Sequence, residues 1–219
     1  MSWVYHDTNR YGSMTQPEME QNVYEIYSQL YTNYGWTVNA ISAVLGNMQR
    51  ESYINPAQTQ GGYPIGSKGG GYGLCMWTPA SKLFNWLKAN NHSRLSGYWQ
   101  VYVLNDPNFP SASDPQYKST NAFPMSYELF KHSGQTVAYL TEAFLKNYER
   151  AGSQALAERI TYAEAWYRYL MGVDPPPYEV LPPDPPWPPE PPPEPTPDPS
   201  GYRGFSKVNI YLRSPRFRF

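Results

Sequence analysis

The sequence predicts a mainly α-helical domain in residues 1–173, followed by an extended proline-rich arm. Two observations predict the domain: apolar residues recur at helical spacing in several runs, and glycine-rich or turn-rich stretches separate these runs. A third observation predicts the arm, because residues 174–200 hold 15 of the chain's 24 prolines. Proline fixes φ and lacks a backbone N–H, so this stretch cannot form a helix or a central strand.

Cap residues mark the first two predicted helices. The first is expected over residues 17–34, because Pro17 is favoured at a helix start and Gly35 just past a helix end. The second is expected over residues 38–50, with Thr37 as its N-cap. Its buried face is predicted to consist of apolar residues at helical spacing: Ala40, Ile41, Val44, Leu45 and Met48.

Three more helices are expected further along the chain, over residues 81–90, 136–150 and 154–171. Residues 58–73 contain seven glycines and are predicted to form a loop or a short hairpin. Residues 106–121 are rich in turn formers, and we expect them to be exposed. The last helix is predicted to bury four residues that are in phase: Ile160, Ala163, Tyr167 and Leu170.

Beyond the domain, two segments differ sharply in charge. Residues 174–200 carry six acidic residues and no basic one, and as a polyproline II spacer they would reach about 80 Å. Residues 201–219 carry five Lys or Arg and no acid, with alternating apolar residues over 207–213. We expect this basic segment to dock on a partner protein, either as an added edge strand or on an acidic surface. A disordered tail is the alternative.

Composition excludes several classes of protein. A formal net charge of −1 argues against a general nucleic-acid binder. The single cysteine, Cys75, excludes an internal disulfide and a cysteine-based zinc site, and the three histidines lack metal-binding spacing. No phosphate-binding glycine motif is present, so neither a metal nor another cofactor is expected. No apolar run reaches the roughly 18 residues of a membrane span, and the first residues lack the features of a secretory signal.

An acidic residue stands at the end of the second predicted helix. Glu51 follows an apolar helix and precedes the helix-breaking Asn55-Pro56. The negative end of a helix dipole disfavours an ionised acid, and burial against the apolar face would add to this effect. Both favour the protonated carboxyl that a general acid for glycosidic cleavage needs. The alternative is a solvated Glu51 that pairs with Arg50 or with a base further along the chain.

A second informative passage, residues 71–79, follows the glycine-rich stretch. Glycines allow a backbone to approach a ligand closely, and Tyr72 and Trp77 offer ring faces for sugars. Aromatic residues make up 16% of the whole chain, which suits either a sugar-stacking surface or an aromatic core. Taken alone, this passage favours an ordinary flexible loop over a sugar site.

Together the two passages resemble the phage tail lysozyme family. The chain has GWT at residues 35–37, GNMQRESYINP at 46–56, GYGLCMWTP at 71–79 and YER at 148–150, in the order and spacing of that family. The resemblance covers about residues 16–171, and a looser likeness extends to goose-type lysozymes and lytic transglycosylases. It implies a lysozyme-like helical domain with the glycine-rich loop or hairpin at its cleft.

The resemblance implies that Glu51 is the catalytic acid of a peptidoglycan glycosidase that cuts between N-acetylmuramic acid and N-acetylglucosamine. Met76 departs from the family pattern, which usually has Gln there, and a thioether cannot replace an amide that bonds the sugar or holds Glu51. Residues implied to bind substrate lie at the helix end, in the segment lining the cleft and in the later helix that closes it: Ser52, Tyr72, Gly73, Leu74, Trp77, Tyr148 and Glu149.

Two features of the chemistry stay open at the level of sequence. A second carboxylate acts as base or nucleophile in most glycosidases, and Asp7, Asp106 and Glu149 are all candidates. The single-Glu members of the wider superfamily cut either by hydrolysis or by attack of the muramic 6-hydroxyl, which leaves an anhydro product. We favour hydrolysis because the family is described as lysozyme.

The sequence also allows three biological settings. The first is a virion enzyme, made in the host cytoplasm, that opens the bacterial cell wall at infection while residues 174–219 tether it to a phage tail or virion protein. The second is an endolysin that lyses the host at the end of infection. The third is a lysozyme-like tail protein that binds glycan without cutting it, and the retained Glu51 argues against this setting.

Overall fold

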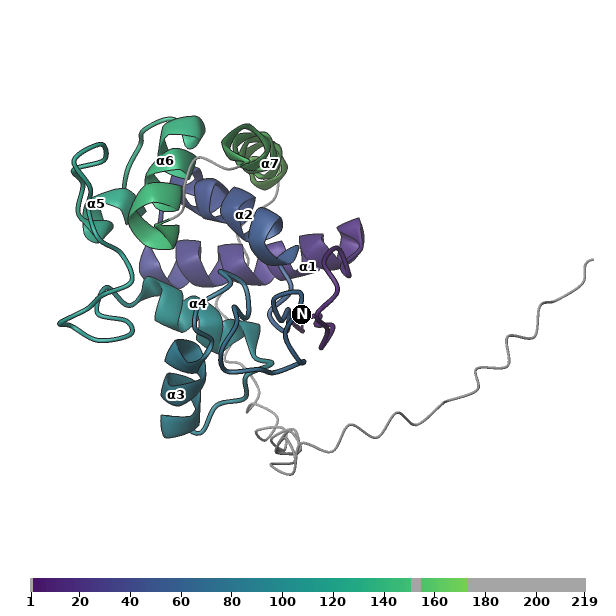
Figure 1. The fold of residues 1–219 in the computed structure, drawn as a ribbon. Helices are drawn as coiled ribbons and strands as arrows, with labels where there is room; N and C mark the ends of the chain where they lie inside the picture. The colour runs from purple at the N-terminus through teal and green to yellow at the C-terminus, as the bar shows by residue number, and fades with distance from the viewer. Residues whose placement is uncertain (1, 151–154, 173–219) are drawn as a thin grey trace, which may run out of the picture.

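The structure, a computed structural model, describes residues 2–150 and 155–172 (Figure 1). The described residues form seven α-helices and no strand, which confirms the predicted mainly α class. The proline-rich arm and the basic segment expected over 174–219 lie outside them. Two π-helical turns, η1 (Ser28–Asn33) and η2 (Leu145–Glu149), extend helices α1 and α6. The helices are α1 (Gln16–Tyr27), α2 (Val38–Ser52), α3 (Ser81–Ala89), α4 (Gly97–Asn105), α5 (Tyr127–Lys131), α6 (Val137–Phe144) and α7 (Leu156–Leu170).

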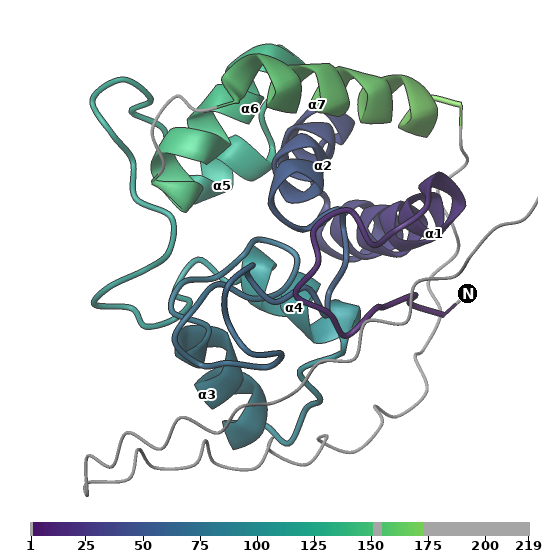
Figure 2. The same ribbon diagram turned by 45° about the vertical axis from the view of Figure 1, so that its right-hand side comes forward.

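The helices form two groups that meet at the C-terminal end of α2. Helix α2 packs mainly against α6 and α7, and these three lie together at one side of the molecule (Figures 1 and 2). Helices α3 and α4 lie at the opposite side with the glycine-rich loop. None of the helices described by the structure is long and apolar enough to cross a membrane.

Helices α1 and α2 form where the sequence predicts them. Thr15 and Glu18 make a capping box at the start of α1, and the helix runs on through η1 to Gly35, whose φ is +69°. The side chain of Thr37 accepts a hydrogen bond from the Ala40 N–H at the start of α2. All five residues predicted for the inner face of α2 are buried.

Helix α7 forms as predicted, but its buried face is rotated from the predicted one. Arg159 and Trp166 are buried with Ala163 and Leu170, whereas the predicted Ile160 and Tyr167 are only partly buried. An Arg within an apolar pattern is predicted to face solvent. Arg159 is buried instead because the carboxylate of Glu51 on α2 pairs with its guanidinium. The two helices also pack closely at Gly46 of α2. A Cβ at that position would lie 2.4 Å from the backbone oxygen of Arg159, so a glycine is needed for α7 to come this near.

Two helices were not predicted. Helix α4 is apolar around much of its circumference, so it lacks the polar face on which periodicity depends. Helix α5 has only five residues, which is too short for a periodic pattern. The expected exposure of residues 106–121 is also wrong for Phe109 and Tyr117, which are buried. Both belong to an aromatic core whose largest fully buried members include Trp36, Trp77, Tyr72, Tyr148, Phe130 and Phe144.

The glycine-rich segment is a loop rather than a regular hairpin. Isolated bridges join Thr59 to Tyr72 and Tyr72 to Trp77, and the described residues contain no strand there. The loop is instead tied down by side chains: the Gln60 Oε1 accepts from the Gly71 N–H at 2.7 Å. A hydrogen bond from Ser52, the last residue of α2, to the Leu74 carbonyl holds the segment against the C-terminal end of α2, where the site lies.

Candidate active site

A cavity of about 420 Å³ opens where α2 ends, between the glycine-rich loop and η2. Both acidic residues of interest, Glu51 and Glu149, line it. The remaining lining residues come from the N-terminal segment, the loop, the start of α3 and the chain around η2: Tyr11, Arg50, Gln58, Thr59, Gln60, Gly61, Cys75, Met76, Trp77, Thr78, Lys82, Gln116 and Arg150.

Glu51 forms an ion pair with α7. The Nη2 of Arg159 lies 2.5 Å from Glu51 Oε1, and its Nη1 donates a hydrogen bond to Asn47 Oδ1 at 3.0 Å. The Arg159 side chain is 7% exposed and that of Glu51 is 22% exposed. A base therefore does pair with Glu51, as the alternative allowed, but it is not Arg50, which pairs with Glu158 at 3.1 Å.

Glu149 ends η2 and places its carboxyl in the same cavity. Its Oε1 is buried without a hydrogen-bond partner among the described residues. Burial raises the pKa of Glu149 well above its usual range, and the negative charge of Glu51 raises it further, while Arg159 acts in the opposite direction.

The other two candidates for a second carboxylate lie elsewhere. Asp7 is held by Arg94, with Asp7 Oδ2 2.6 Å from the guanidinium Nη2. Asp106 caps the C-terminal end of α4 and does not line the cavity. Of the three, Glu149 is the one that the structure brings into the cavity with Glu51.

Residues of the GNMQ–ES motif hold other elements around Glu51. Asn47 Nδ2 donates a hydrogen bond to the Thr141 carbonyl of α6 at 3.2 Å. Gln49 Oε1 accepts from Trp166 Nε1 of α7 at 2.8 Å. The motif therefore fixes α6 and α7 relative to the end of α2, and with α7 it fixes Arg159.

The second half of the motif ties down the two coil segments that flank the cavity. Ser52 Oγ donates to the Leu74 carbonyl at 2.9 Å, which anchors the glycine-rich segment. Asn55 Nδ2 donates to the His6 carbonyl at 2.8 Å, which anchors the N-terminal segment. Both residues are fully buried, so their polar groups need these partners.

Trp77 and Glu149 are the implied substrate-binding residues that line the cavity. Trp77 is 1% exposed and its Nε1 donates to the Tyr148 hydroxyl at 3.0 Å. Its ring edge is therefore committed to the core, and little of its surface is free for a sugar.

The other implied substrate-binding residues lie in the core and not on the cavity wall. Their surroundings explain why, since Tyr72 accepts a hydrogen bond from Arg94 Nη1 at 2.7 Å. A Cβ at Gly73 would lie 2.4 Å from Gln100 Oε1, so this glycine permits close packing. Each of the five has partners or packing inside the protein: Ser52, Tyr72, Gly73, Leu74 and Tyr148.

Several polar residues of the cavity wall were missed by the sequence analysis. Met76 lines the cavity where the family pattern has an amide, but amides reach it from Gln58, Gln60 and Gln116. Gln58 Oε1 is buried and has no partner in the described part of the chain. Tyr11 also lines the cavity and is 51% exposed. No single motif marks these residues, because they come from separate segments.

Cys75 is buried at the cavity, and burial together with the charges of Glu149 and Glu51 raises its pKa well above its usual range. A thiol in such surroundings stays protonated and is a poor nucleophile. Within residues 2–150 and 155–172, no three His, Cys, Asp or Glu side chains are grouped to hold a metal ion.

Comparison with known proteins places this site in a family. Residues 21–170 match the family described as phage tail lysozyme. Morphogenesis protein 1 of Bacillus phage B103 is 35% identical over 176 residues, which cover 77% of this chain and 44% of that protein. The chain therefore spans less than half the length of this relative. Because the family match covers more than half of the chain and includes both cavity carboxylates, the chain belongs to the phage tail lysozyme family.

Proposed function

We propose that this chain is a peptidoglycan glycosidase that cuts the glycan between N-acetylmuramic acid and N-acetylglucosamine. The observation that supports this most strongly is that Glu51 and Glu149 line one cavity, with Arg159 bonded to Glu51. In most glycosidases one carboxyl donates a proton and a second one carries negative charge. A carboxyl pair in different surroundings suits these two roles.

In this proposal Glu51 donates the proton to the glycosidic oxygen, and Glu149 is the second carboxyl. The charges of the two groups repel, so the pair retains one proton to a higher pH than a solvated carboxyl would. Once the proton has left, Arg159 stabilises the negative charge that remains on Glu51. In the free protein burial favours this proton on Glu149. In this proposal it passes to Glu51 when the substrate binds, which leaves Glu149 as the charged carboxyl and Glu51 as the donor.

The wall of the cavity supplies groups that suit an amino sugar. Gln58 Oε1 is buried in the cavity wall without a partner among the described residues, and Gln60 is exposed there, so these two amides can offer an acceptor and a donor to hydroxyl and acetamido groups. Tyr11 presents an exposed ring and a hydroxyl at the rim, and its hydroxyl donates to the Arg50 carbonyl at 2.7 Å. In this proposal these residues take over the amide function that Met76 lacks.

We further propose that the cut is a hydrolysis and that the protein acts from the virion. The family description and the name of the B103 relative, a morphogenesis protein, support a phage particle protein. In this account the domain opens the cell wall when infection begins, after synthesis in the host cytoplasm. Residues 201–219 would join it to a tail or virion protein through the proline-rich arm.

Clearing of purified peptidoglycan, followed by mass spectrometry of the released fragments, tests the proposed reaction. We expect clearing by the parent with free reducing ends on muramic acid, and none by Glu51→Gln. Glu164→Gln is the matched control, because it neutralises an exposed α7 acid that does not line the cavity. Anhydro-muramic ends on the fragments would show that the reaction is transglycosylation and not hydrolysis. Failure of the parent to clear walls of several types would overturn the proposal and favour a glycan-binding protein.

A further inference from the structure

One corner of the cavity carries a surplus of positive charge. Three basic residues line the cavity: Arg50, Lys82 and Arg150. The charge of Arg50 is met by Glu158, whose Oε2 lies 3.1 Å from its Nε. Neither Lys82 nor Arg150 has a carboxylate within ion-pair distance in the part of the chain that the structure describes. Within residues 2–150 and 155–172, the Arg150 side chain makes one long hydrogen bond of 3.5 Å, from its Nη2 to Gln116 Oε1.

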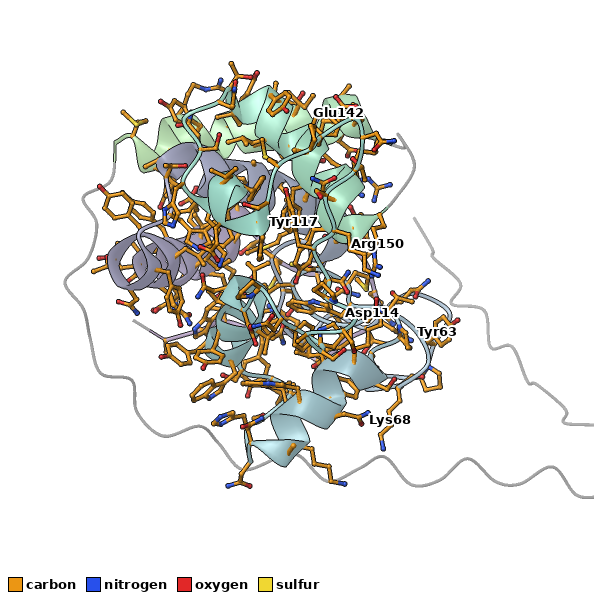
Figure 3. The ribbon with its side chains drawn as sticks, turned by 90° about the vertical axis from the view of Figure 1, so that its left-hand side faces the viewer. Tyr63, Lys68, Asp114, Tyr117, Glu142 and Arg150 are labelled. Carbon is orange, nitrogen blue, oxygen red and sulfur yellow. The ribbon has the colours of Figure 1, made fainter. Side chains whose placement is uncertain are left out.

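The cations at this corner act on one another. Burial lowers the pKa of Lys82, and the positive charges of Arg150 and Lys118 lower it further. Asp114 opposes this effect, but its Oδ1 already accepts a hydrogen bond from Lys118 Nζ at 2.5 Å. In the view of Figure 3, Arg150, Asp114 and Tyr63 of the glycine-rich loop are seen at the same side of the molecule. An anion placed between Lys82 and Arg150 would relieve this repulsion.

The fold places the two cations next to the carboxyl pair. Arg150 directly follows Glu149 and adopts a left-handed backbone conformation at the end of η2. Lys82 is the second residue of α3, five residues after Trp77, and both line the cavity. A ligand that lies over Glu149 therefore passes beside Arg150, and Lys82 lies on the wall of the same cavity.

We propose that Lys82 and Arg150 bind a carboxylate carried by the muramic-acid side arm of the glycan. This inference rests on the proposed function, in which the sugar bond lies over Glu51 and Glu149. N-Acetylglucosamine has no carboxylate, whereas muramic acid bears a lactyl group that is either free or extended by a peptide with carboxylates of its own. Arg and Lys bind carboxylates through charge-assisted hydrogen bonds, and Arg can do so through two parallel bonds. The cavity thereby selects a muramic-acid glycan over a neutral polymer of N-acetylglucosamine.

Binding measured without turnover tests the inference separately from the proposed reaction. Fragments are titrated by calorimetry into Glu51→Gln protein, alone and combined with Lys82→Ala or Arg150→Ala. Three probes are used: a glycan fragment with peptide stems, the same fragment stripped to free lactyl carboxylates, and a neutral N-acetylglucosamine oligomer. We expect each cation substitution to weaken binding of carboxylate-bearing fragments roughly tenfold, the size of one charge-assisted bond, and to leave the neutral oligomer unaffected.

Lys88→Ala is the matched control, because Lys88 lies on the same helix and does not line the cavity. If the cation substitutions weaken binding of the stripped fragment alone, the site is assigned to the lactyl carboxylate. If they weaken binding of the intact fragment alone, it is assigned to a carboxylate of the peptide. Equal affinities of parent and variants for both charged fragments would overturn the inference, as would an equal loss for the neutral oligomer. If the unsubstituted protein binds these fragments but never cuts them, only the proposed reaction is overturned.

Discussion

The Nη2 of Arg159 on α7 lies 2.5 Å from Oε1 of Glu51 at the end of α2. This contact joins the last helix of the domain to the acidic residue of the sequence motif, 108 positions apart in the chain. The guanidinium is almost fully buried, so the pair is held by packing of α7 on α2. The protonation of the carboxyl pair therefore depends on the position of α7, although α7 does not itself line the cavity.

Removing the charge of Arg159 should move the pH profile of activity. Arg159 lowers the pKa of Glu149, so Arg159→Met raises that pKa and the pair keeps its proton to higher pH. We expect the alkaline limb of the kcat/KM profile to shift to higher pH, with lower activity at the optimum. Arg159→Lys keeps the charge and should leave the limb near its original position. An unchanged limb in Arg159→Met, in protein that is folded by circular dichroism, would contradict this account.

Gly46→Ala should destabilise the protein although Ala is the better helix former. A Cβ there would lie 2.4 Å from the Arg159 carbonyl oxygen and 2.7 Å from the Ala163 backbone nitrogen, so α7 must shift. Overpacking of this kind costs about 1–3 kcal/mol of unfolding free energy, more than the helix propensity gain of up to about 1 kcal/mol. Urea denaturation measures the difference. Gly134→Ala is the control, because nothing lies within 4 Å of its Cβ, and equal stability of the two variants would refute the argument.

Glu149 should make stability depend on pH with a defined sign. Its folded-state pKa is raised above the unfolded value of about 4.3, so the native state holds a proton that the unfolded chain has lost. The free energy of unfolding is therefore highest below that unfolded pKa and falls as the pH rises towards the folded pKa. We expect Glu149→Gln to gain stability relative to the parent at pH 8 but not at pH 4, as measured by urea midpoints. A difference independent of pH would show that Glu149 is ionised in the folded state.

The predictable part of the fold is the part whose signals are local. Thr37 and Gly35 marked helix boundaries, and the apolar period of α2 identified its buried face. Helix α4 escaped prediction because its apolar residues surround the helix, and the face of α7 was misplaced because Arg159 is a buried cation. Arg159 is buried because it pairs with Glu51 on α2, and the spacing of residues within α7 gives no information about that partner.

The same distinction applies to the site. Glu51 stands in a long motif, so the sequence alone singled it out. The sequence left three candidates for the second carboxylate because their positions depend on tertiary packing. Glu149 lines the cavity, whereas Asp7 and Asp106 do not. Tyr72 and Leu74 belong to the second passage, residues 71–79, which also holds the cavity residues Met76 and Trp77, but they lie in the core. A motif can therefore include residues that hold the loop as well as residues that face the cavity.

A double-mutant cycle on Glu51 and Glu149 tests the central claim most directly, namely that the two carboxyls act as one unit. The kcat/KM on a defined peptidoglycan fragment is measured for the parent, Glu51→Gln, Glu149→Gln and the double variant, with melting curves to confirm that each is folded. We predict that each single substitution lowers kcat/KM by roughly 100-fold or more, and that the double variant is no worse than the poorer single one. Parent-like activity in Glu149→Gln, or losses that multiply in the double variant, would contradict the account.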